Sequence, residues 1–363
     1  MLRPFRRFDV ILILQEFRIS FLAINKGEEV ASVGIIANPQ SGKDIRRLVA
    51  LASSFSNNEK VLMLRRVMAG LAAMGLDNIL IFNDLGSLGA VAVDGFRHEN
   101  KNSRVKLFEV DARGETVDST NAARKLDELG VRCIVVLGGD GTCRAVAKGC
   151  GRIPLIPLST GTNNAFPFSW EGTVAGMAAA LYALYPRAYG SEKQVTKQLH
   201  VNLNGNSEKA LVDIAILKES FYGARAIWDI GRVDSLALTR SEPGRLGLSS
   251  LGASLRPIGA NEPLGLWLKL GPKSKTNHRV LSPIGPGQVA SAQVMEHEIV
   301  KPGEPVKYRA PDDRVLAFDG ERECLVSKGE EIEISLRLDG PSVLNVPAIL
   351  KKAAIRGDLQ MRN

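Results

Sequence analysis

Short apolar runs alternate with longer segments of helical spacing along the first half of the chain. Runs at 33–37, 79–82, 105–110 and 133–137 have the length and composition of buried strands. Strands alternating with helices are typical of a parallel sheet covered by helices on both faces, which binds its ligands at the carboxyl ends of the strands. The helical segments that we predict are one with apolar positions at Leu48, Leu51 and Phe55, followed by 59–74, 119–129 and 143–148.

The pattern changes after Pro167. An Ala- and Gly-rich helix at 171–184 is followed by short strands separated by Gly and Pro turns, which indicate a mainly β second domain. We therefore place an α/β nucleotide-binding domain at 31–168 and a β-rich substrate domain at 169–345. A C-terminal helix within 346–363 is expected to return to the first domain. The predicted strands lie at 197–203, 210–217, 264–270, 289–295, 315–318 and 331–338.

The composition is typical of a folded protein, and its positive net charge suits an anionic ligand. A length of 363 residues is enough for two cores, and 47 Lys plus Arg against 39 Asp plus Glu give a net charge of +8. The basic residues are scattered and form no nucleic-acid-binding motif, so we expect no nucleic-acid partner. The four cysteines lack CxxC spacing, which favours reduced structural thiols over a zinc site.

The first 30 residues are predicted to be an extension that lies outside the fold. Basic residues precede an apolar stretch there, as in a signal peptide, but Asp9, Glu16 and Arg18 interrupt it. A translation start placed too early is an alternative explanation of this segment. No apolar run reaches membrane-spanning length. We expect a cytoplasmic protein that forms a homo-oligomer and has no membrane partner.

The clearest candidate site follows the strand at 133–137 directly. Glycines let the backbone approach an anion closely, and the start of the next helix offers free amides and a positive dipole end, so phosphate is the expected guest. An aspartate here would repel bare phosphate, which favours a role in holding magnesium or accepting a proton from a hydroxyl. A plain turn with this aspartate as a helix cap is the alternative. The string is Gly138, Gly139, Asp140, Gly141 and Thr142.

A second polar turn ends the next apolar stretch. Its hydroxyl and amide side chains can bind phosphate oxygens, ribose or adenine edges, although an ordinary loop would be the default for such a turn alone. Neighbouring strand ends with polar turns form one cleft, which favours a role in nucleotide binding. The candidate residues are Thr160, Gly161, Thr162, Asn163 and Asn164.

The turn at 38–43 only partly resembles a P-loop. A P-loop requires glycine at position 37 and Ser or Thr at 44, where this chain has Ala37 and Asp44. Phosphate contact at a helix start and a simple capped turn are equal alternatives for it. The candidate phosphate ligands are Asn38, Ser41, Gly42 and Lys43.

An acidic turn in the second domain is the remaining candidate. Asp319 or Glu321 could act as a base or metal ligand if this domain closes over the cleft, whereas a charged hairpin turn is the more common structure. The histidines form no motif. No GxSxG or HExxH sequence occurs, which disfavours serine hydrolases and zinc proteases.

Taken in order, NPQSGK, GGDGT, STGTNN and DGE resemble the superfamily of NAD kinases, diacylglycerol kinases and sphingosine kinases. The chain is most similar to the ATP-NAD kinase/AcoX branch, the latter named for acetoin catabolism, from about residue 33 to residue 359. RRVMAGLAAMG at 65–75, GARAIWD at 223–229 and AFDGERE at 317–323 belong to this resemblance. It implies an NAD kinase-like α/β fold, with a parallel α/β N-terminal domain, a mainly β C-terminal domain, and ATP with Mg²⁺ bound between them.

The resemblance implies two alternative carboxylate sites for the catalytic base. In NAD kinases the aspartate of GGDGT, here Asp140, is the proposed base, whereas lipid kinases use the DGE turn, here Asp319 and Glu321. We expect Asp140 to organise magnesium and phosphates, and Asp319 or Glu321 to help activate the acceptor. The chain lacks the Asn-Glu pair and TGSTAY-like stretch of NAD kinases, and STGTNN is closer to the lipid-kinase GTxN turn. The acceptor, whether NAD, a small polar metabolite or a lipid, therefore stays open.

We predict a cytoplasmic kinase that transfers a phosphoryl group from ATP, or alternatively polyphosphate, to a small-molecule hydroxyl. If the acceptor is NAD, the product is NADP. Low aromatic content and the lack of a basic amphipathic helix argue against a lipid acceptor. A non-catalytic nucleotide-binding protein linked to acetoin catabolism is one alternative. A dinucleotide-dependent oxidoreductase is disfavoured because no GxGxxG follows the first strand.

Overall fold

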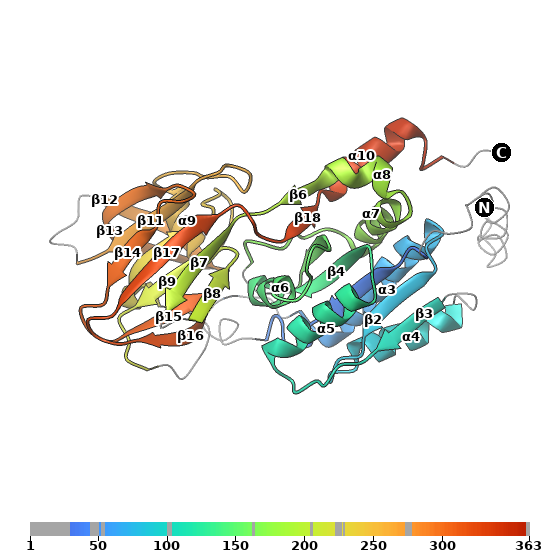
Figure 1. The fold of residues 1–363 in the computed structure, drawn as a ribbon, viewed down its shortest axis with the longest axis horizontal. Coiled ribbons are helices and arrows are strands. Elements are labelled where there is room, and N and C mark those ends of the chain that lie inside the picture. Colours follow the sequence, from blue (N-terminus) through green and yellow to red (C-terminus); the bar gives the residue numbers. More distant parts are fainter. Residues whose placement is uncertain are drawn as a thin grey trace.

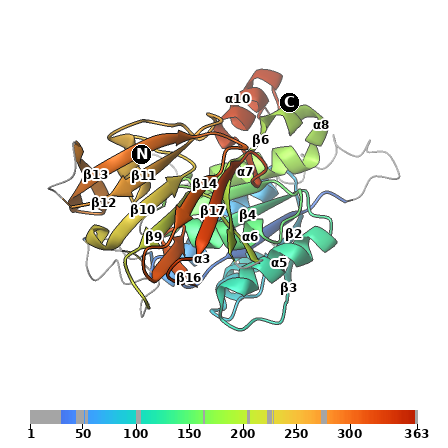
Figure 2. The ribbon, with the colours of Figure 1, turned by 60° about the vertical axis from the view of Figure 1, so that its left-hand side comes forward.

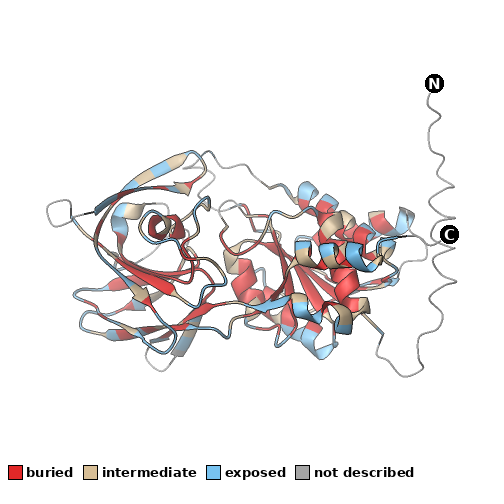
Figure 3. Cartoon of the chain, turned by 90° about the horizontal axis from the view of Figure 1, so that it is seen from above, coloured by how far each residue is buried: buried red, intermediate tan, exposed pale blue. Residues whose placement is uncertain are grey.

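The structure is a computed structural model of one chain, and it forms two lobes that lie side by side (Figure 1). It describes residues 30–43, 51, 55–99, 104–161, 164–203, 206–221, 227, 229–272 and 278–360. Residues 1–29 of the predicted N-terminal extension, most of the helical segment around Leu48, and most of GARAIWD at 223–229 lie outside these ranges. Buried residues fill the interior of each lobe (Figure 3).

A seven-stranded sheet forms the middle of the first lobe, in the order β3-β2-β1-β4-β5-β18-β6. Strands β1 and β4 are buried at every position, as expected of parallel strands covered on both faces. The first five strands are parallel, so the carboxyl ends of β1, β4 and β5 lie next to one another. The strands are β1 (Val33–Ala37), β2 (Asn78–Phe82), β3 (Arg104–Phe108), β4 (Cys133–Gly138), β5 (Leu155–Ser159), β6 (Lys193–Val195) and β18 (Ser342–Leu344).

Helices cover both faces of this sheet. Helices α3, α4, α7 and α10 pack into one apolar core, and α5 and α6 pack into the other. Glycines allow α3 and α7 to approach closely, since a β-carbon on Gly70 would lie 2.2 Å from the Thr173 carbonyl oxygen. The helices are α3 (Asn57–Ala73), α4 (Leu88–Glu99), α5 (Thr116–Glu128), α6 (Asp140–Ala147), α7 (Gly172–Leu184), α8 (Pro186–Tyr189), α10 (Val346–Arg356) and the 3₁₀ turn η1 (Gly190–Glu192).

The second lobe consists of two antiparallel sheets with an apolar core between them (Figure 2). The seven-stranded sheet has the order β12-β13-β11-β10-β9-β15-β16, and the four-stranded sheet has the order β14-β17-β7-β8. The elements are β7 (Gln198–Leu203), β8 (Asn206–Ala210), β9 (Asp213–Leu217), η2 (Ile230–Arg232), β10 (Val233–Leu238), α9 (Ser249–Ala253), β11 (Gly265–Leu270), β12 (His278–Gly285), β13 (Gln288–Val300), β14 (Val306–Arg309), β15 (Arg314–Phe318), β16 (Glu321–Val326) and β17 (Glu331–Arg337).

The predicted fold class, a parallel α/β domain followed by a mainly β domain, is confirmed. Helix α7, which sequence analysis placed at the start of the second domain, packs against α3 in the first lobe. Strand β18 pairs with β5, and α10 packs against α7, so the end of the described chain lies in the first lobe (Figure 1). None of the helices in the described part of the chain has both the length and the apolar character needed to cross a membrane.

Candidate active site

Three polar turns are joined by hydrogen bonds where β1, β4 and β5 end. The Asn38 side-chain amide donates to Thr142 Oγ1 at 2.8 Å, which joins the first turn to GGDGT. The hydroxyls of Ser41 and Thr160 lie 2.7 Å apart, which joins the first turn to the third. The Thr160 amide donates to the Gly138 carbonyl at 3.1 Å. The turns that the sequence placed at neighbouring strand ends therefore form one surface.

Asn164 packs over the glycines of two of these turns. Its side-chain amide donates to Ser159 Oγ at 2.8 Å. A β-carbon would lie 2.8 Å from Asn164 Oδ1 if it were added to Gly139, and 2.5 Å from it if added to Gly161. Glycine at these two positions therefore allows the Asn164 side chain to approach the backbone closely. Of the predicted nucleotide ligands, Thr162 and Asn163 lie outside the described residues.

Asp140 holds the third turn in place. It is the first residue of α6, with Gly139 as N-cap, so it is not the helix cap that the structural alternative required. Its carboxylate accepts hydrogen bonds from the backbone amides of Ala165, at 3.0 and 3.1 Å, and of Phe166, at 2.8 Å. The carboxylate therefore fixes the backbone that follows STGTNN.

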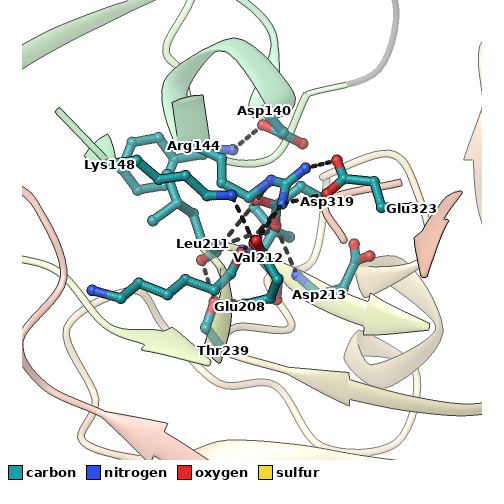
Figure 4. Close-up of polar contacts among 12 residues, drawn as sticks. Asp140, Arg144, Lys148, Glu208, Leu211, Val212, Asp213, Thr239, Asp319 and Glu323 are labelled. Atoms are coloured by element: carbon teal, nitrogen blue, oxygen red, sulfur yellow. Dashed lines mark hydrogen bonds and ion pairs between the residues drawn. The ribbon is translucent and has the colours of Figure 1, made fainter. Parts of the chain in front are cut away.

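The Asp319 carboxylate likewise fixes a backbone segment, in this case one in the second domain (Figure 4). It forms a two-residue turn between β15 and β16 with Gly320, with φ values of 50° and 80°, as a tight Asp-Gly hairpin requires. The turn directs its carboxylate inward, where it accepts amide hydrogen bonds from Leu211, Val212 and Asp213 at 2.7 to 3.2 Å. The side chain has no exposed surface.

Burial changes the protonation of Asp319. Burial, helped by the nearby charge of Asp140, raises the pKa of this carboxyl from 3.8 to about 6. The charge of Arg144 and the amide hydrogen bonds act in the opposite direction but are outweighed. Two carboxylates thus influence each other where the domains meet, and one of them titrates close to neutral pH.

Helix α6 connects the two domains through charged side chains one turn apart (Figure 4). Arg144, whose side chain is 3% exposed, places Nε 3.6 Å from Asp319 Oδ2 and Nη1 3.1 Å from Glu323 Oε2. Its guanidinium also lies over the Phe318 ring. One turn later, Lys148 Nζ lies 2.6 Å from a Glu208 carboxylate oxygen. Residues 140, 144 and 148 share one face of the helix because of their spacing.

Glu321 lies against the first turn of α6. A β-carbon on Gly141 would lie 2.9 Å from Glu321 Oε1, so this glycine leaves the space that the carboxylate of the other domain occupies. The DGE turn and GGDGT, which are far apart in sequence, therefore form two sides of one site.

A cleft of about 560 Å³ opens over these turns. Among its described lining residues, Lys43 is the single cation and faces six carboxylates. Asp84 and Asp118 were not predicted from sequence; Asp118 accepts amide hydrogen bonds from residues 113–115 and Asp84 accepts one from Gly89. The predicted residues that line the cleft are Asn38, Ser41, Gly42, Lys43, Gly139, Asp140, Gly141, Thr142, Gly161, Asn164, Asp319 and Glu321, and the remaining acids are Asp84, Glu115 and Asp118.

A buried lysine donates hydrogen bonds to the backbone of the first turn. Lys60, on α3, donates to the carbonyl oxygens of Pro39 at 3.0 Å and Ser41 at 2.8 Å. Burial, and then the charge of Lys43, lower the pKa of Lys60 to about 8. In the sequence its only signal is a lysine within the apolar helical pattern at 59–74.

A second, smaller cavity of about 30 Å³ lies beside Asp140 and Asp319. Only Asp140 and Asp319, among the described residues, line both cavities. Asp213, which is 6% exposed, contributes a third carboxylate to the smaller one. The Asp140–Asp319 pair thus forms the partition between a large polar cleft and a small cavity.

The donor set of the cleft suits a magnesium ion that arrives with phosphates. No group of three His, Cys, Asp or Glu side chains in the described ranges is arranged to hold a metal alone. Mg²⁺ ordinarily takes one or two carboxylates, with phosphate oxygens and water as its other ligands. Asp140 and Glu321 offer such oxygens, whereas the buried Asp319 carboxylate is taken up by backbone amides and Arg144. The surplus of negative charge in the cleft favours a cation.

Family models match both domains. The ATP-NAD kinase N-terminal domain matches residues 33–184, and the acetoin catabolism protein X C-terminal domain matches residues 197–339. Acetoin catabolism protein X of Cupriavidus necator is 33% identical over 330 residues, which is 88% of this chain and 92% of that protein. The chain belongs to the acetoin catabolism protein X family. The predicted membership is thereby confirmed, with its NAD kinase-like first domain.

Among solved structures, the chain is similar to a Bacillus anthracis str. Sterne protein provisionally described as a diacylglycerol kinase. The TM-score is 0.46 with 13% sequence identity, over 90% of this chain and 99% of that chain.

Proposed function

We propose that this member of the acetoin catabolism protein X family transfers a phosphoryl group from ATP to a hydroxyl of a small molecule. The observation that carries the proposal is the partition: Asp140 and Asp319 face both the large cleft and the small cavity. A donor in one cavity and an acceptor in the other would meet at these two residues.

The large cleft supports the nucleotide side of the proposal. Its floor combines the glycines of GGDGT, the N-terminus of the eight-residue helix α6 and the hydroxyls of Ser41 and Thr142. Free amides and a positive dipole end at a helix N-terminus bind phosphate. Its volume of about 560 Å³ is within the range of small-molecule and cofactor sites.

The negative lining implies that the nucleotide binds with magnesium. Asp140 and Glu321 would hold the ion together with phosphate oxygens, and the ion would neutralise charge on the phosphates. Without a cation, the carboxylates of the cleft would repel a triphosphate.

The carboxylates placed to accept the proton of the attacking hydroxyl are those of Asp140 and Glu321, which line the cleft. The hydroxyl oxygen attacks the terminal phosphorus, the bond to the bridging oxygen breaks, and ADP leaves with that electron pair. The hydroxyl proton passes to one of these two carboxylates. Asp319, whose side chain has no exposed surface and lies 3.6 Å from Arg144, holds the DGE turn in position.

Replacement of Asp140 tests the proposal directly. Asp140→Asn is expected to reduce phosphoryl transfer by at least about a hundredfold, since the electrostatic role of the site is lost. Transfer is measured with γ-labelled ATP, magnesium and a panel of hydroxyl compounds that includes NAD and a diacylglycerol, with products identified by mass. Asp94→Asn is the matched control, because Asp94 is an 82% exposed aspartate on α4. Wild-type rates in Asp140→Asn would refute the site.

One observation favours a second candidate, a protein that binds nucleotide without transferring phosphate. The carboxylates of Asp140 and Asp319 each accept two or more backbone hydrogen bonds, which is also the arrangement of purely structural anchors. Stable MgATP binding with no consumption of ATP by any compound of the panel would support this candidate.

A further inference from the structure

We infer that Arg240 makes the proposed active site bind a divalent cation as part of a nucleotide complex and not as the free ion. This inference rests on the nucleotide and metal site of the proposed function and adds how that site distinguishes free magnesium from nucleotide-bound magnesium. Arg240 directly follows β10 in the second domain and is 3% exposed. The proposed transfer assigns it no role.

The Arg240 guanidinium is buried without an ion pair. Its Nε has no hydrogen-bond partner, and no carboxylate of the described residues lies within ion-pair distance of it. Burial lowers the pKa of Arg240, which reflects the cost of removing its charge from water. Arg144, by contrast, is paired with two carboxylates. Because a buried charge without a partner is costly, a structural role alone does not account for Arg240.

A contact between the two domains places Arg240 next to the segment that holds Asp140. Its guanidinium lies over the ring of Phe166, 5.3 Å from the ring centroid. The Phe166 backbone amide donates to Asp140 Oδ1 at 2.8 Å. One residue of the first domain therefore contacts both the arginine and the carboxylate.

The residue before Arg240 is bound to the segment that holds Asp319. Thr239 Oγ1 donates to the Leu211 carbonyl at 2.8 Å, and the Leu211 amide donates to the Asp319 carboxylate at 3.0 and 3.1 Å (Figure 4). The positions of Arg240, Asp140 and Asp319 are thus fixed by shared backbone segments.

The charge of Arg240 acts on these two carboxylates. After burial, the charges of Glu242 and Asp140 have the largest effects on the pKa of Arg240 and raise it, as does that of Asp319, whereas Arg245 lowers it. The interaction is mutual, so Arg240 makes the electrostatic potential at Asp140 and Asp319 less negative. Because Arg240 lines neither the large cleft nor the small cavity, it acts through this potential and not by contact with a ligand.

A fixed positive charge has opposite effects on the two forms of the metal. It repels a free divalent cation at Asp140 and Glu321. It attracts a magnesium–triphosphate complex, because the negative charge of the phosphates exceeds the positive charge of the ion. The described lining of the large cleft contains six carboxylates and the single cation Lys43, so the cleft without Arg240 would attract the free ion.

Arg240→Met tests the inference, because it removes the charge and leaves an apolar side chain. Without nucleotide, binding of Mn²⁺, which takes the same oxygen ligands as Mg²⁺, is measured from the loss of the EPR signal of the free ion. We expect the variant to bind Mn²⁺ at least about tenfold more tightly than the wild type. Calorimetry with the magnesium complex of AMPPNP, a non-hydrolysable ATP analogue, should give an affinity at least about threefold weaker. A folding defect would weaken both.

Arg245→Met is the matched control. Arg245 also lies over a ring of the first domain, that of Phe168, at 5.6 Å from the centroid. Its side chain is 30% exposed, however, and its Nε lies 3.5 Å from Glu242 Oε2. Because its charge is paired and partly screened by water, we expect both affinities to stay within about twofold of the wild type.

Arg240→Lys separates the effect of charge from that of shape. The buried lysines Lys60 and Lys197 have pKa values of about 8, so we expect a lysine at this position to stay charged at pH 6.5. At that pH both affinities should lie within about threefold of the wild type. A gain in Mn²⁺ affinity as large as that of Arg240→Met would show that charge is not the cause.

The outcomes separate this inference from the function on which it rests. If the wild type does not bind the AMPPNP complex, the proposed function and this inference both fail. If the complex binds but Arg240→Met binds Mn²⁺ no more tightly than the wild type, or Arg245→Met gains equally, the inference alone is wrong. If the two affinities of Arg240→Met change in opposite directions but no hydroxyl compound is phosphorylated, the transfer is wrong and the role of Arg240 stands.

Discussion

Arg144 of helix α6 and Glu323 of strand β16 form an ion pair across the two domains, with Nη1 3.1 Å from Oε2. The same guanidinium lies 3.6 Å from the Asp319 carboxylate and over the Phe318 ring. Because the helix that carries Arg144 begins at Asp140, the ion pair fixes the proposed catalytic carboxylates relative to each other.

Removal of Arg144 should destabilise the protein strongly. Arg144→Met leaves Asp319 and Glu323 without their cation, and breaking a buried pair costs about 3 to 5 kcal/mol of the free energy of unfolding. Urea denaturation measures this loss. Glu323→Gln should cost less in the Arg144→Met background than in the wild type, because the two residues interact. Lys148→Met, at the more exposed pair with Glu208, is expected to cost at most about 1 kcal/mol. A similar cost in both single variants would contradict the proposed role of Arg144.

A methyl group on Gly141 should separate the two sides of the site. The added carbon would lie 2.9 Å from Glu321 Oε1, so the Glu321 carboxylate must move away from the start of α6. We expect Gly141→Ala to lower kcat for phosphoryl transfer by at least about tenfold, because small displacements of reacting groups cost this much. Gly190→Ala is the matched control, since a β-carbon there meets no atom within 4 Å. Steady-state kinetics of both variants test this, and an active Gly141→Ala enzyme would count against the contact.

The titration of Asp319 should appear in the pH dependence of stability. Its pKa is about 6 in the folded protein against 3.8 for the ordinary group, so the folded state keeps a proton that the unfolded state releases. The resulting stabilisation is fully present below about pH 4 and is lost as the pH rises through about 6. It amounts to at most about 3 kcal/mol of the free energy of unfolding.

Denaturation between pH 4 and pH 7 measures this contribution. The slope of stability against pH should be less negative in Asp319→Asn than in the wild type. Glu304→Gln, which changes a carboxylate that is 66% exposed, should keep the wild-type slope. Parallel curves for Asp319→Asn and the wild type would show that the carboxyl titrates normally.

Loss of Lys60 should weaken nucleotide binding. Lys60→Met leaves the carbonyl oxygens of Pro39 and Ser41 without their donor, so the turn at 38–43 loses the support that positions it. We expect the Kd for MgATP to rise by about tenfold, which corresponds to about 1.4 kcal/mol. Lys125→Met is the control, because Lys125 is a half-exposed lysine on α5 that pairs with Glu128 and does not line the cleft. Calorimetry that gives equal affinities for both variants would exclude this role.

Local patterns in the sequence predicted the strands and the turns at their ends. Val33–Ala37 and Cys133–Gly138 are apolar throughout because both faces of the sheet are covered, and this pattern is visible in the sequence. Helix α4 and strand β10 were not predicted. The small residues of α7 were recognised as helical, but their packing against α3 depends on a contact between distant segments.

The charged residues inside the protein were harder to predict. The sequence at Asp319 and Gly320 predicted a charged hairpin turn as the more common structure, and their backbone forms such a turn. The Asp319 carboxylate, however, is buried against the amides of residues 211–213. Lys60 gave no signal beyond a lysine within an apolar helical pattern, and Arg144 gave none, because their partners lie in other elements. A carboxylate that binds backbone amides leaves no pattern in the partner residues, since every amide is chemically alike.

The place of β18 in the first sheet has a consequence for how the protein is made. Strand β18 lies between β5 and β6, and α10 behind it packs on α7. During synthesis on the ribosome, the sheet beside β5 must stay open until residue 344 has emerged, long after the rest of the first domain. Folding of this domain therefore ends only after translation of the second, and nascent chains would expose an unpaired strand edge to chaperones during that interval.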